Sequence, residues 1–152
     1  MGLEPDTGYY VVLASRAFMR VAEARLRPLG LGAAHMPVLL ALTEQGSLTQ
    51  KELARITQIK QPTAAALLQR MEAAGLVVRA PDSRDGRATL VSLTERGTSL
   101  LPVALDQRRQ AIEAATAGMS PQEVEWLNSL LARVMVNLQA LVNGSDDGQP
   151  AP

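Results

Sequence analysis

The chain has 152 residues, of which 47% are hydrophobic and 20% are charged, and its 15 basic residues balance 15 acidic ones. This composition is typical of a single soluble globular domain, and the zero net charge excludes a general nucleic-acid coat, which would be strongly basic. The absence of cysteine excludes a disulfide scaffold, a cysteine zinc site and thiol redox sensing. Because the chain has one histidine, we expect no metal site and no cofactor.

The sequence also limits location and chemistry. No apolar run reaches the roughly 18 residues of a membrane span. The N-terminal stretch MGLEPDTG lacks the basic-then-apolar order of a signal peptide. We therefore expect a cytoplasmic protein without membrane contact. No nucleophile–base pair, metal cluster or phosphate-binding loop stands out, so no enzyme is predicted.

The N-terminal part is predicted to be helical. Residues 1–7 carry no helical pattern, and a helix with widely spread apolar residues follows from about residue 8 to residue 27. This spread indicates burial on more than one side. The run Pro28-Leu29-Gly30-Leu31-Gly32 breaks the helix. A second helix is predicted over residues 33–44, in which Pro37 should cost a backbone hydrogen bond.

Two short helices joined by a tight turn are predicted next. Thr49 and Glu52 form a capping box, which places the start of the first helix at Thr49. The turn falls at residues 57–60, and Pro62 suits the first position of a second helix that runs to about residue 74. Gly75 is the residue type that commonly follows a helix C-terminus.

A hairpin is predicted after the helix pair. Its strands cover residues 77–80 and 88–93, and the tip PDSRDGR contains the strong turn signal Asp-Gly. A helix-turn-helix followed by a hairpin wing is a nucleic-acid-docking unit. Residues 47–96 hold eight basic and five acidic residues, a local net charge of +3 that suits a phosphate-facing surface. The fold class is therefore mainly α, a winged helix-turn-helix with a small β-hairpin.

The C-terminal part is predicted to form two further helices. Thr94 is an expected N-cap for a helix over residues 95–117, which Pro102 should kink. Ser120 and Glu123 form a second capping box. The last helix is strongly apolar, so we expect it to pair with the same helix of a second chain. Gly144 should end it, and residues 145–152 should be disordered.

The run DSRDGR, followed by a strand and then LTERG, resembles the wing of the MarR family of bacterial transcriptional regulators, and QRMEAAGLVVR resembles the end of that family's recognition helix. The resemblance covers about residues 9–142. It implies one domain over residues 1–152, with dimerisation helices at 8–32 and 95–143, a winged helix-turn-helix lobe at 33–94, and tails at 1–7 and 145–152. It further implies a homodimer that docks on a pseudo-palindromic operator in duplex DNA and represses a nearby gene.

By position, the resemblance assigns the DNA contacts. Arg87 corresponds to the arginine at the wing tip that enters the minor groove, Asp85 to the residue that positions it, and Asp82 and Arg84 complete the motif. The exposed face of the recognition helix supplies further contacts at Gln61, Thr63, Ala65 and Ala66. From the residues alone, Lys60 and Arg70 are further candidates: Lys60 either contacts a phosphate or is solvated, and Arg70 either contacts the DNA backbone or pairs with Glu72 or Asp82. Half-sites should lie about 10 bp apart, as for other symmetric helix-turn-helix dimers.

The resemblance also implies release of DNA by a small aromatic or lipophilic anion bound between the dimerisation helices and the lobe. The candidate residues are Arg16, His35, Tyr10 and Met36, with Tyr9 and Phe18 as further lining. For Arg16 and His35 the alternatives are a surface arginine and an ordinary first-turn histidine. A second functional alternative is a winged-helix module that binds proteins and does not contact DNA.

Overall fold

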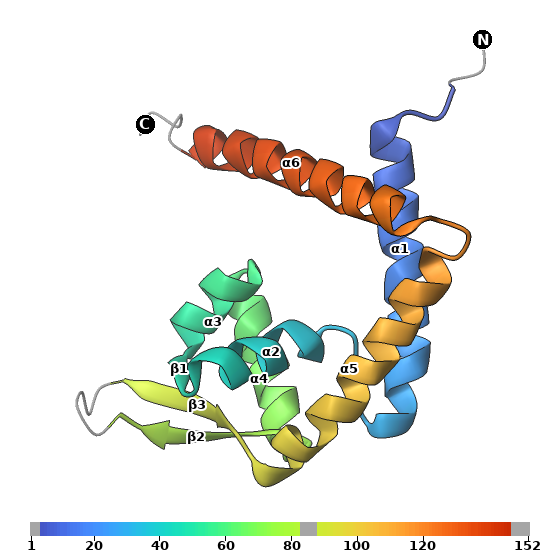
Figure 1. Cartoon of the computed structure of the whole chain (residues 1–152). Helices are drawn as coiled ribbons and strands as arrows, with labels where there is room; N and C mark the ends of the chain where they lie inside the picture. The colour runs from blue at the N-terminus through green and yellow to red at the C-terminus, as the bar shows by residue number, and fades with distance from the viewer. Residues whose placement is uncertain (1–3, 83–87, 147–152) are drawn as a thin grey trace. The chain divides into compact units, whose positions relative to one another are not determined.

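The computed structural model describes residues 4–82 and 88–146, and the side chains up to residue 142 (Figure 1). Two compact units, residues 1–112 and 113–152, make up the chain. The elements in order are α1 (Thr7–Leu26), a 3₁₀ turn (Arg27–Leu29), α2 (His35–Gln45), β1 (Leu48–Thr49), α3 (Gln50–Thr57), α4 (Gln61–Ala73), β2 (Val77–Pro81), β3 (Thr89–Leu93), α5 (Glu95–Ala115) and α6 (Pro121–Asp146). The predicted class, mainly helical with a winged helix-turn-helix, is confirmed.

The capping box at the start of α3 is present as predicted. The Thr49 hydroxyl accepts a hydrogen bond from the Glu52 amide at 3.2 Å, and the Glu52 carboxylate accepts one from the Thr49 amide at 2.7 Å. These bonds to the backbone and hydroxyl of Thr49 lower the pKa of Glu52. Because two amides without helical partners are satisfied reciprocally, the start of α3 is fixed locally.

The turn and the end of α4 are also set by local chemistry. Gln58 takes a left-handed conformation with φ of 57°, which turns the chain sharply after α3. At the other end, the Gly75 amide donates to the Glu72 carbonyl and the Leu76 amide donates to the Met71 carbonyl, both at 2.9 Å. This is a Schellman motif, and Gly75 supplies the positive φ of 69° that it requires. The predicted end of α4 is therefore confirmed.

The wing belongs to a three-stranded antiparallel sheet of order β1-β3-β2. Strands β2 and β3 pair from Val77 with Leu93 to Pro81 with Thr89, close to the predicted hairpin. Strand β1 was not predicted. Its two residues, Leu48 and Thr49, pair with Val91 and Leu90, and a pairing so short and so distant in sequence leaves no alternating pattern to detect.

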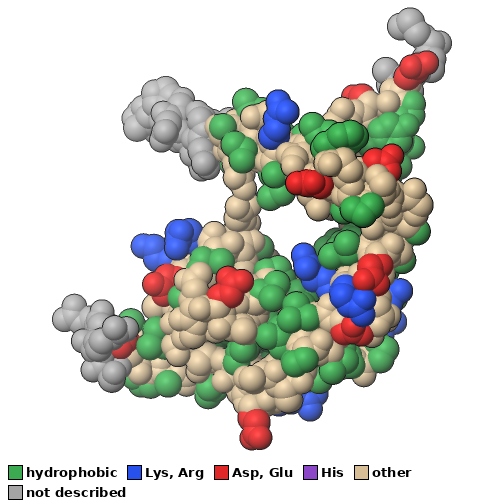
Figure 2. All heavy atoms as spheres, viewed as in Figure 1, with side chains coloured by type: hydrophobic (Ala, Val, Ile, Leu, Met, Phe, Trp, Pro, Cys, Tyr) green, Lys and Arg blue, Asp and Glu red, His purple; other side chains and the backbone are tan. Residues whose placement is uncertain are grey.

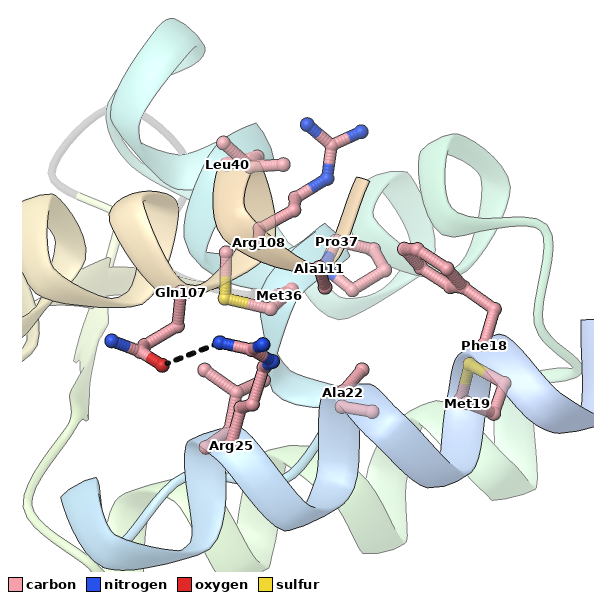
Figure 3. Close-up of a pocket in the computed structure, with 12 residues that line it drawn as sticks. Phe18, Met19, Ala22, Arg25, Met36, Pro37, Leu40, Gln107, Arg108 and Ala111 are labelled. Atoms are coloured by element: carbon pink, nitrogen blue, oxygen red, sulfur yellow. Dashed lines mark hydrogen bonds between the residues drawn. The ribbon is translucent and has the colours of Figure 1, made fainter. Parts of the chain in front are cut away.

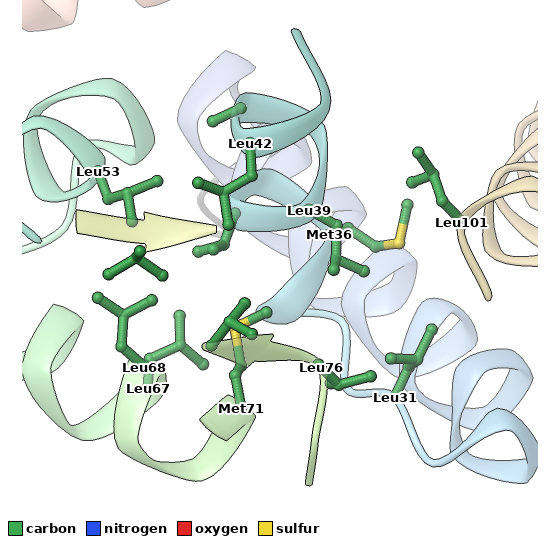
Figure 4. Close-up of a cluster of buried hydrophobic side chains, with 14 of the residues drawn as sticks. Leu31, Met36, Leu39, Leu42, Leu53, Leu67, Leu68, Met71, Leu76 and Leu101 are labelled. Atoms are coloured by element: carbon green, nitrogen blue, oxygen red, sulfur yellow. The ribbon is translucent and has the colours of Figure 1, made fainter. Parts of the chain in front are cut away.

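We use "lobe" for α2, α3, α4 and the three-stranded sheet. The core of the lobe is packed from all of these elements (Figure 4), and its most deeply buried side chains are Val38, Leu39, Leu53, Leu68, Met71, Leu76, Val77 and Val91. Full burial of such a side chain stabilises the fold by about 1.5–3 kcal/mol. Leu26 and Leu31, which precede the lobe, and Leu101 and Ala104 of α5 extend the same cluster. The lobe is thus held by one continuous core within a single chain.

Helix α5 begins where predicted and packs closely on the base of the wing. The Thr94 hydroxyl accepts a hydrogen bond from the Gly97 amide at 3.0 Å, as an N-cap does, and donates to the Gly75 carbonyl at 2.6 Å. A Cβ at Gly97 would overlap the Leu76 carbonyl oxygen, so glycine is required for this approach. The helix continues through Pro102 to Ala115.

Several predicted boundaries need correction. Helix α4 begins at Gln61, one residue before the predicted start, so Pro62 is its second residue. Helix α2 begins at His35 and not at residue 33, so Pro37 lies in the first turn, where an amide has no helical acceptor and its loss costs no hydrogen bond. The prediction of a lost bond was wrong. At the N-terminus, Thr7 is already helical, since the Asp6 carboxylate caps α1 by accepting from the Tyr9 amide at 2.8 Å.

Helix α6 starts at the predicted capping box and ends later than predicted. The Ser120 amide donates to the Glu123 carboxylate at 2.7 Å, and the Glu123 amide donates to the Ser120 hydroxyl at 3.3 Å. The helix runs to Asp146, so Gly144 does not end it, and the first two residues of the predicted disordered tail 145–152 are helical. A glycine in a helix costs about 1 kcal/mol relative to alanine, which weakens a helix without stopping it.

The apolar side chains of α6 remain on the surface of the chain (Figure 2). Leu130, Leu138 and Leu141 are 56%, 52% and 68% exposed. At helical spacing they lie on one face with Val124, Leu127, Leu131 and Val134. In the part of the chain that the structure describes, no helix is long and apolar enough to cross a membrane.

Candidate nucleic-acid interface

Helix α4 has one buried and one outward face. Its buried face consists of Ala64, Leu67, Leu68 and Met71, all at most 4% exposed. Opposite them, three or four residues apart, lie the exposed residues Pro62, Ala66, Gln69 and Ala73. The lobe therefore fixes the rotation of α4 about its axis, because turning the helix would expose its four core residues.

The structure places most of the predicted base-facing residues at the surface of α4. Gln61, Thr63, Ala66 and Arg70 are exposed, and Lys60 is exposed just before the helix. Ala65 differs, because it is half-buried. Near the helix N-terminus the exposed set is uncharged, with the polar Gln61 and Thr63 beside Ala66, and the cations Lys60 and Arg70 flank it in the sequence.

Among the described residues, no side chain caps the N-terminus of α4, so its first-turn amides can bind a ligand. Lys60 occupies the N-cap position, but its side chain makes no capping hydrogen bond. The first-turn amides of Gln61 and Thr63 have no acceptor within the helix, and Pro62 has no amide hydrogen. Such amides at the positive end of a helix favour an anion such as a phosphate.

The two strands of the wing are hydrogen-bonded up to the residues just below its tip. The Asp82 amide donates to the Ala88 carbonyl at 2.8 Å, which closes the hairpin below its tip. Arg79 of β2 forms an ion pair with Glu72 of α4 at 3.2 Å, which links β2 to α4 within the lobe. The predicted wing-tip residues Arg84, Asp85 and Arg87 fall within 83–87, outside the described residues.

A second candidate site is a cavity of about 280 Å³ within the first unit, bounded by α1, α2 and α5 (Figure 3). Its wall is mostly apolar, with two arginines and a glutamine, and is formed by Phe18, Met19, Ala22, Arg25, Leu26, Ala33, Met36, Pro37, Leu40, Gln107, Arg108 and Ala111. A cavity with apolar walls and a few cationic or amide groups suits a small amphipathic anion.

Arg25 is held at the cavity by α5. Its guanidinium donates to the side-chain oxygens of Gln110 at 3.1 Å and Gln107 at 3.5 Å. Gln110 in turn donates to the Asp106 carboxylate at 2.7 Å. The hydrogen bonds from Arg109 and Gln110 lower the pKa of Asp106. This chain of contacts orients Arg25 at the edge of an apolar space.

The predicted effector residues separate into two groups. Met36 and Phe18 line the cavity, whereas Arg16, His35, Tyr10 and Tyr9 are not among its lining residues. Arg25, Gln107 and Arg108 were not predicted, because the two sides of the cavity are about 80 residues apart in the sequence and no local pattern links them.

His35, which does not line the cavity, makes a contact that holds the backbone. Its Nδ1 accepts a hydrogen bond from the Gly32 amide at 3.0 Å, which requires that nitrogen to be unprotonated. Burial lowers the pKa of His35, the charge of Arg70 lowers it further, and the charge of Glu23 partly opposes both. Beside it, the Glu23 carboxylate accepts from the Ala33 amide at 2.8 Å, so both side chains hold the connection between α1 and α2.

Metal binding finds no support in the described residues, which contain no group of three or more His, Cys, Asp or Glu side chains that could hold an ion.

Comparisons with known proteins agree with this geometry. The MarR family profile matches residues 29–88. The organic hydroperoxide resistance transcriptional regulator of Bacillus subtilis is 30% identical over 141 residues, which cover 93% of this chain and 92% of the relative. The transcriptional repressor IacR of Pseudomonas putida is 28% identical over 133 residues, covering 88% of this chain and 80% of the relative.

A solved structure shows the same fold on DNA. A MarR mutant from E. coli, complexed with operator DNA, superimposes with a TM-score of 0.78 and 25% identity, and the match covers 84% of this chain and 91% of that chain. The relative at 30% identity over most of both chains, the family match over the helix-turn-helix and the first strand of the wing, and the shared fold all point to the same family. The chain is a DNA-binding transcriptional regulator and belongs to the MarR family.

Proposed function

We propose that the chain binds a pseudo-palindromic operator as a homodimer and represses a neighbouring gene until a small anion releases it. The observation that carries the proposal is the fixed rotation of α4, which presents an exposed face of small and uncharged side chains from the lobe. The N-terminal part of such a helix meets base edges in the major groove. Repression is supported by the repressor of P. putida among the relatives.

The exposed residues of α4 have separate roles in this proposal. Gln61, Thr63 and Ala66 face base edges, whereas Lys60 and Arg70 lie at the two ends and contact phosphates. The open amides at the start of α4 add a phosphate contact. Ala65 contributes less to the contact with DNA, since its side chain is half-buried.

The wing completes the interface. By their position in the sequence motif, Arg84 and Arg87 enter the minor groove, and Asp85 holds Arg87 by bidentate pairing. Arg87→Ala should weaken operator binding by about 1–3 kcal/mol and leave the folded dimer intact. Titration of labelled operator measures the loss, and sedimentation checks the dimer. Unchanged affinity would remove the wing from the mechanism.

Two copies are needed to read two half-sites. The exposed apolar face of α6 supplies a surface for a second chain, and symmetric pairing would give the dimerisation region proposed for residues 8–32 and 95–143, with the lobe at 33–94. Half-sites about 10 bp apart follow from this symmetry. Binding of only a half-site-sized duplex, with one chain per duplex, would contradict it.

DNA binding is tested against the alternative of a protein-interaction module by varying salt. The logarithm of the affinity of a DNA-binding lobe falls linearly with the logarithm of salt concentration, because phosphate contacts release counterions. A gel shift with the DNA upstream of the protein's own coding sequence, repeated at several salt concentrations, measures this slope. A folded protein that shifts no DNA at low salt would favour the interaction module.

The cavity supports regulation by an anion with an apolar body. Its apolar wall would bury the body, and Arg25, with Arg108 nearby, would face the charge. Aromatic carboxylates should therefore lower DNA affinity, and Arg25→Gln should reduce that response without changing affinity in the absence of ligand. Arg16→Gln is the matched control, because Arg16 does not line the cavity. An equal loss of response in both variants would contradict the assignment of Arg25.

A further inference from the structure

We infer that the middle of the α4 face selects A·T base pairs through the methyl groups of thymine. The inference rests on the proposed docking of α4 in the major groove and names the bases that this docking selects. The residues that carry it are Pro62 and Ala66, which form the centre of the outward face over its first two turns, with Thr63 beside them.

The side-chain chemistry of this face disfavours G·C pairs. Arginine and lysine are the side chains that most often bind guanine, through its O6 and N7 atoms, and none occurs between Gln61 and Gln69. The nearest cations in the sequence, Lys60 and Arg70, flank this stretch. Pro62 and Ala66 would displace water from guanine O6 and N7 without replacing its hydrogen bonds, which is unfavourable.

The same face favours thymine. Proline, alanine and the threonine methyl group are small and apolar, so they allow close approach of the helix and contact with the C5-methyl group that thymine places in the major groove. Gln61 and Gln69 can each form a bidentate pair with adenine, which is again part of an A·T pair. Removing one thymine methyl group that is buried against α4 should lower the affinity for the operator about fourfold.

The experiment first selects bound sequences from random duplex DNA with the full-length protein. A palindromic motif should emerge whose half-sites carry A·T pairs where the major groove faces α4. Enriched guanine at these positions would overturn the inference and leave the proposed function standing. No enriched motif from folded protein would overturn the proposed function, and the inference with it.

The second step replaces each thymine of the selected operator by deoxyuridine, one at a time. This change removes the methyl group and preserves base pairing and the minor-groove atoms. One or two positions per half-site should each lose about fourfold in affinity, while positions under the wing should change little. If no position responds, the A·T preference arises from DNA shape or minor-groove contacts, and the inference fails.

The third step identifies the residue that contacts the methyl group. Ala66→Gly removes the side-chain methyl group, so at one thymine the deoxyuridine penalty should disappear. Ala73→Gly is the matched control: it makes the same change two turns further along the exposed face and should keep every penalty. Because each variant is compared with itself on two duplexes, any general weakening of α4 cancels. A penalty that persists in Ala66→Gly would overturn the role of Ala66.

Discussion

The lobe and α6 use their apolar residues in opposite ways. In the lobe, Leu39, Leu53 and Leu68 are at most 1% exposed and share one core with the neighbouring helices and the sheet. Along α6, Leu130 and Leu138 are more than half exposed. The lobe can therefore hold its structure with the residues of one chain. Helix α6 gains comparable burial only from another surface, and in the proposed dimer that surface is its own copy.

The difference indicates where each kind of substitution should act. A change in the lobe should alter the free energy of unfolding of a single chain, whereas a change on the apolar face of α6 should alter association. Substitutions on α6 and at the packing of α5 against the lobe test this division, and a pH dependence from His35 is the smallest effect that we expect.

Leu138→Asp should break the proposed dimer. A carboxylate in an apolar interface would be desolvated without a partner, which should weaken association by about 2–4 kcal/mol. Analytical ultracentrifugation measures the association constant, and operator affinity should fall with it. Val136→Asp is the control, because Val136 is 63% exposed and lies on the opposite side of α6 at helical spacing. Equal losses in both variants would argue against a dimer built on this face.

Gly97→Ala should destabilise the chain itself. The added methyl group would meet the Leu76 carbonyl oxygen, a backbone atom that cannot move without shifting α5 or β2, and such overpacking costs about 1–3 kcal/mol. Gly8→Ala is the matched change near the start of α1. There the methyl group meets only the Asp6 carboxylate at 3.4 Å, so stability should stay the same or rise slightly. Urea unfolding measures both, and a destabilisation no larger at Gly97 than at Gly8 would contradict the close approach.

The smallest expected effect is a pH dependence from His35. Burial lowers its pKa in the folded chain below the ordinary value of 6.5, so the unfolded chain binds the proton more tightly. The stability that neutral His35 contributes is complete above pH 6.5 and is lost as the pH falls through the folded-state pKa. His35→Gln should lose less stability than the wild type when the pH falls from about 7.5 to about 5.5. Thermal unfolding at both pH values measures the change in stability of each protein. An equal change in wild type and variant would exclude His35 as its source.

Local signals in the sequence predicted most of the fold. The capping boxes at Thr49 and Ser120, the N-cap at Thr94 and the positive φ at Gly75 all appear in the structure, because each depends on residues within a few positions. Two local predictions were wrong. Pro37 costs nothing in a first turn, and a single glycine, Gly144, does not stop a helix.

Features that join distant segments could not be predicted. Strand β1 exists because Leu48 and Thr49 meet β3 more than 40 residues later. The cavity joins Arg25 to Gln107 across α1 and α5, so the sequence suggested Arg16 and His35 without any information on which helix faces which. The outward face of α4 was predicted more closely, since helical periodicity alone separates Ala66 from the buried Leu67 and Leu68.

The double role of Thr94 has a mechanical consequence. Its hydroxyl donates to the Gly75 carbonyl just after α4 and accepts from the Gly97 amide at the start of α5, so Thr94 joins the end of α4 to the start of α5. Ala111, on the cavity wall, lies about 25 Å along α5 from Thr94. A displacement of about 1 Å at Ala111 then corresponds to a tilt of only about 2° at Thr94 if α5 moves as a rigid rod. Helix α5 thus links the wall of the cavity to the C-terminal end of α4.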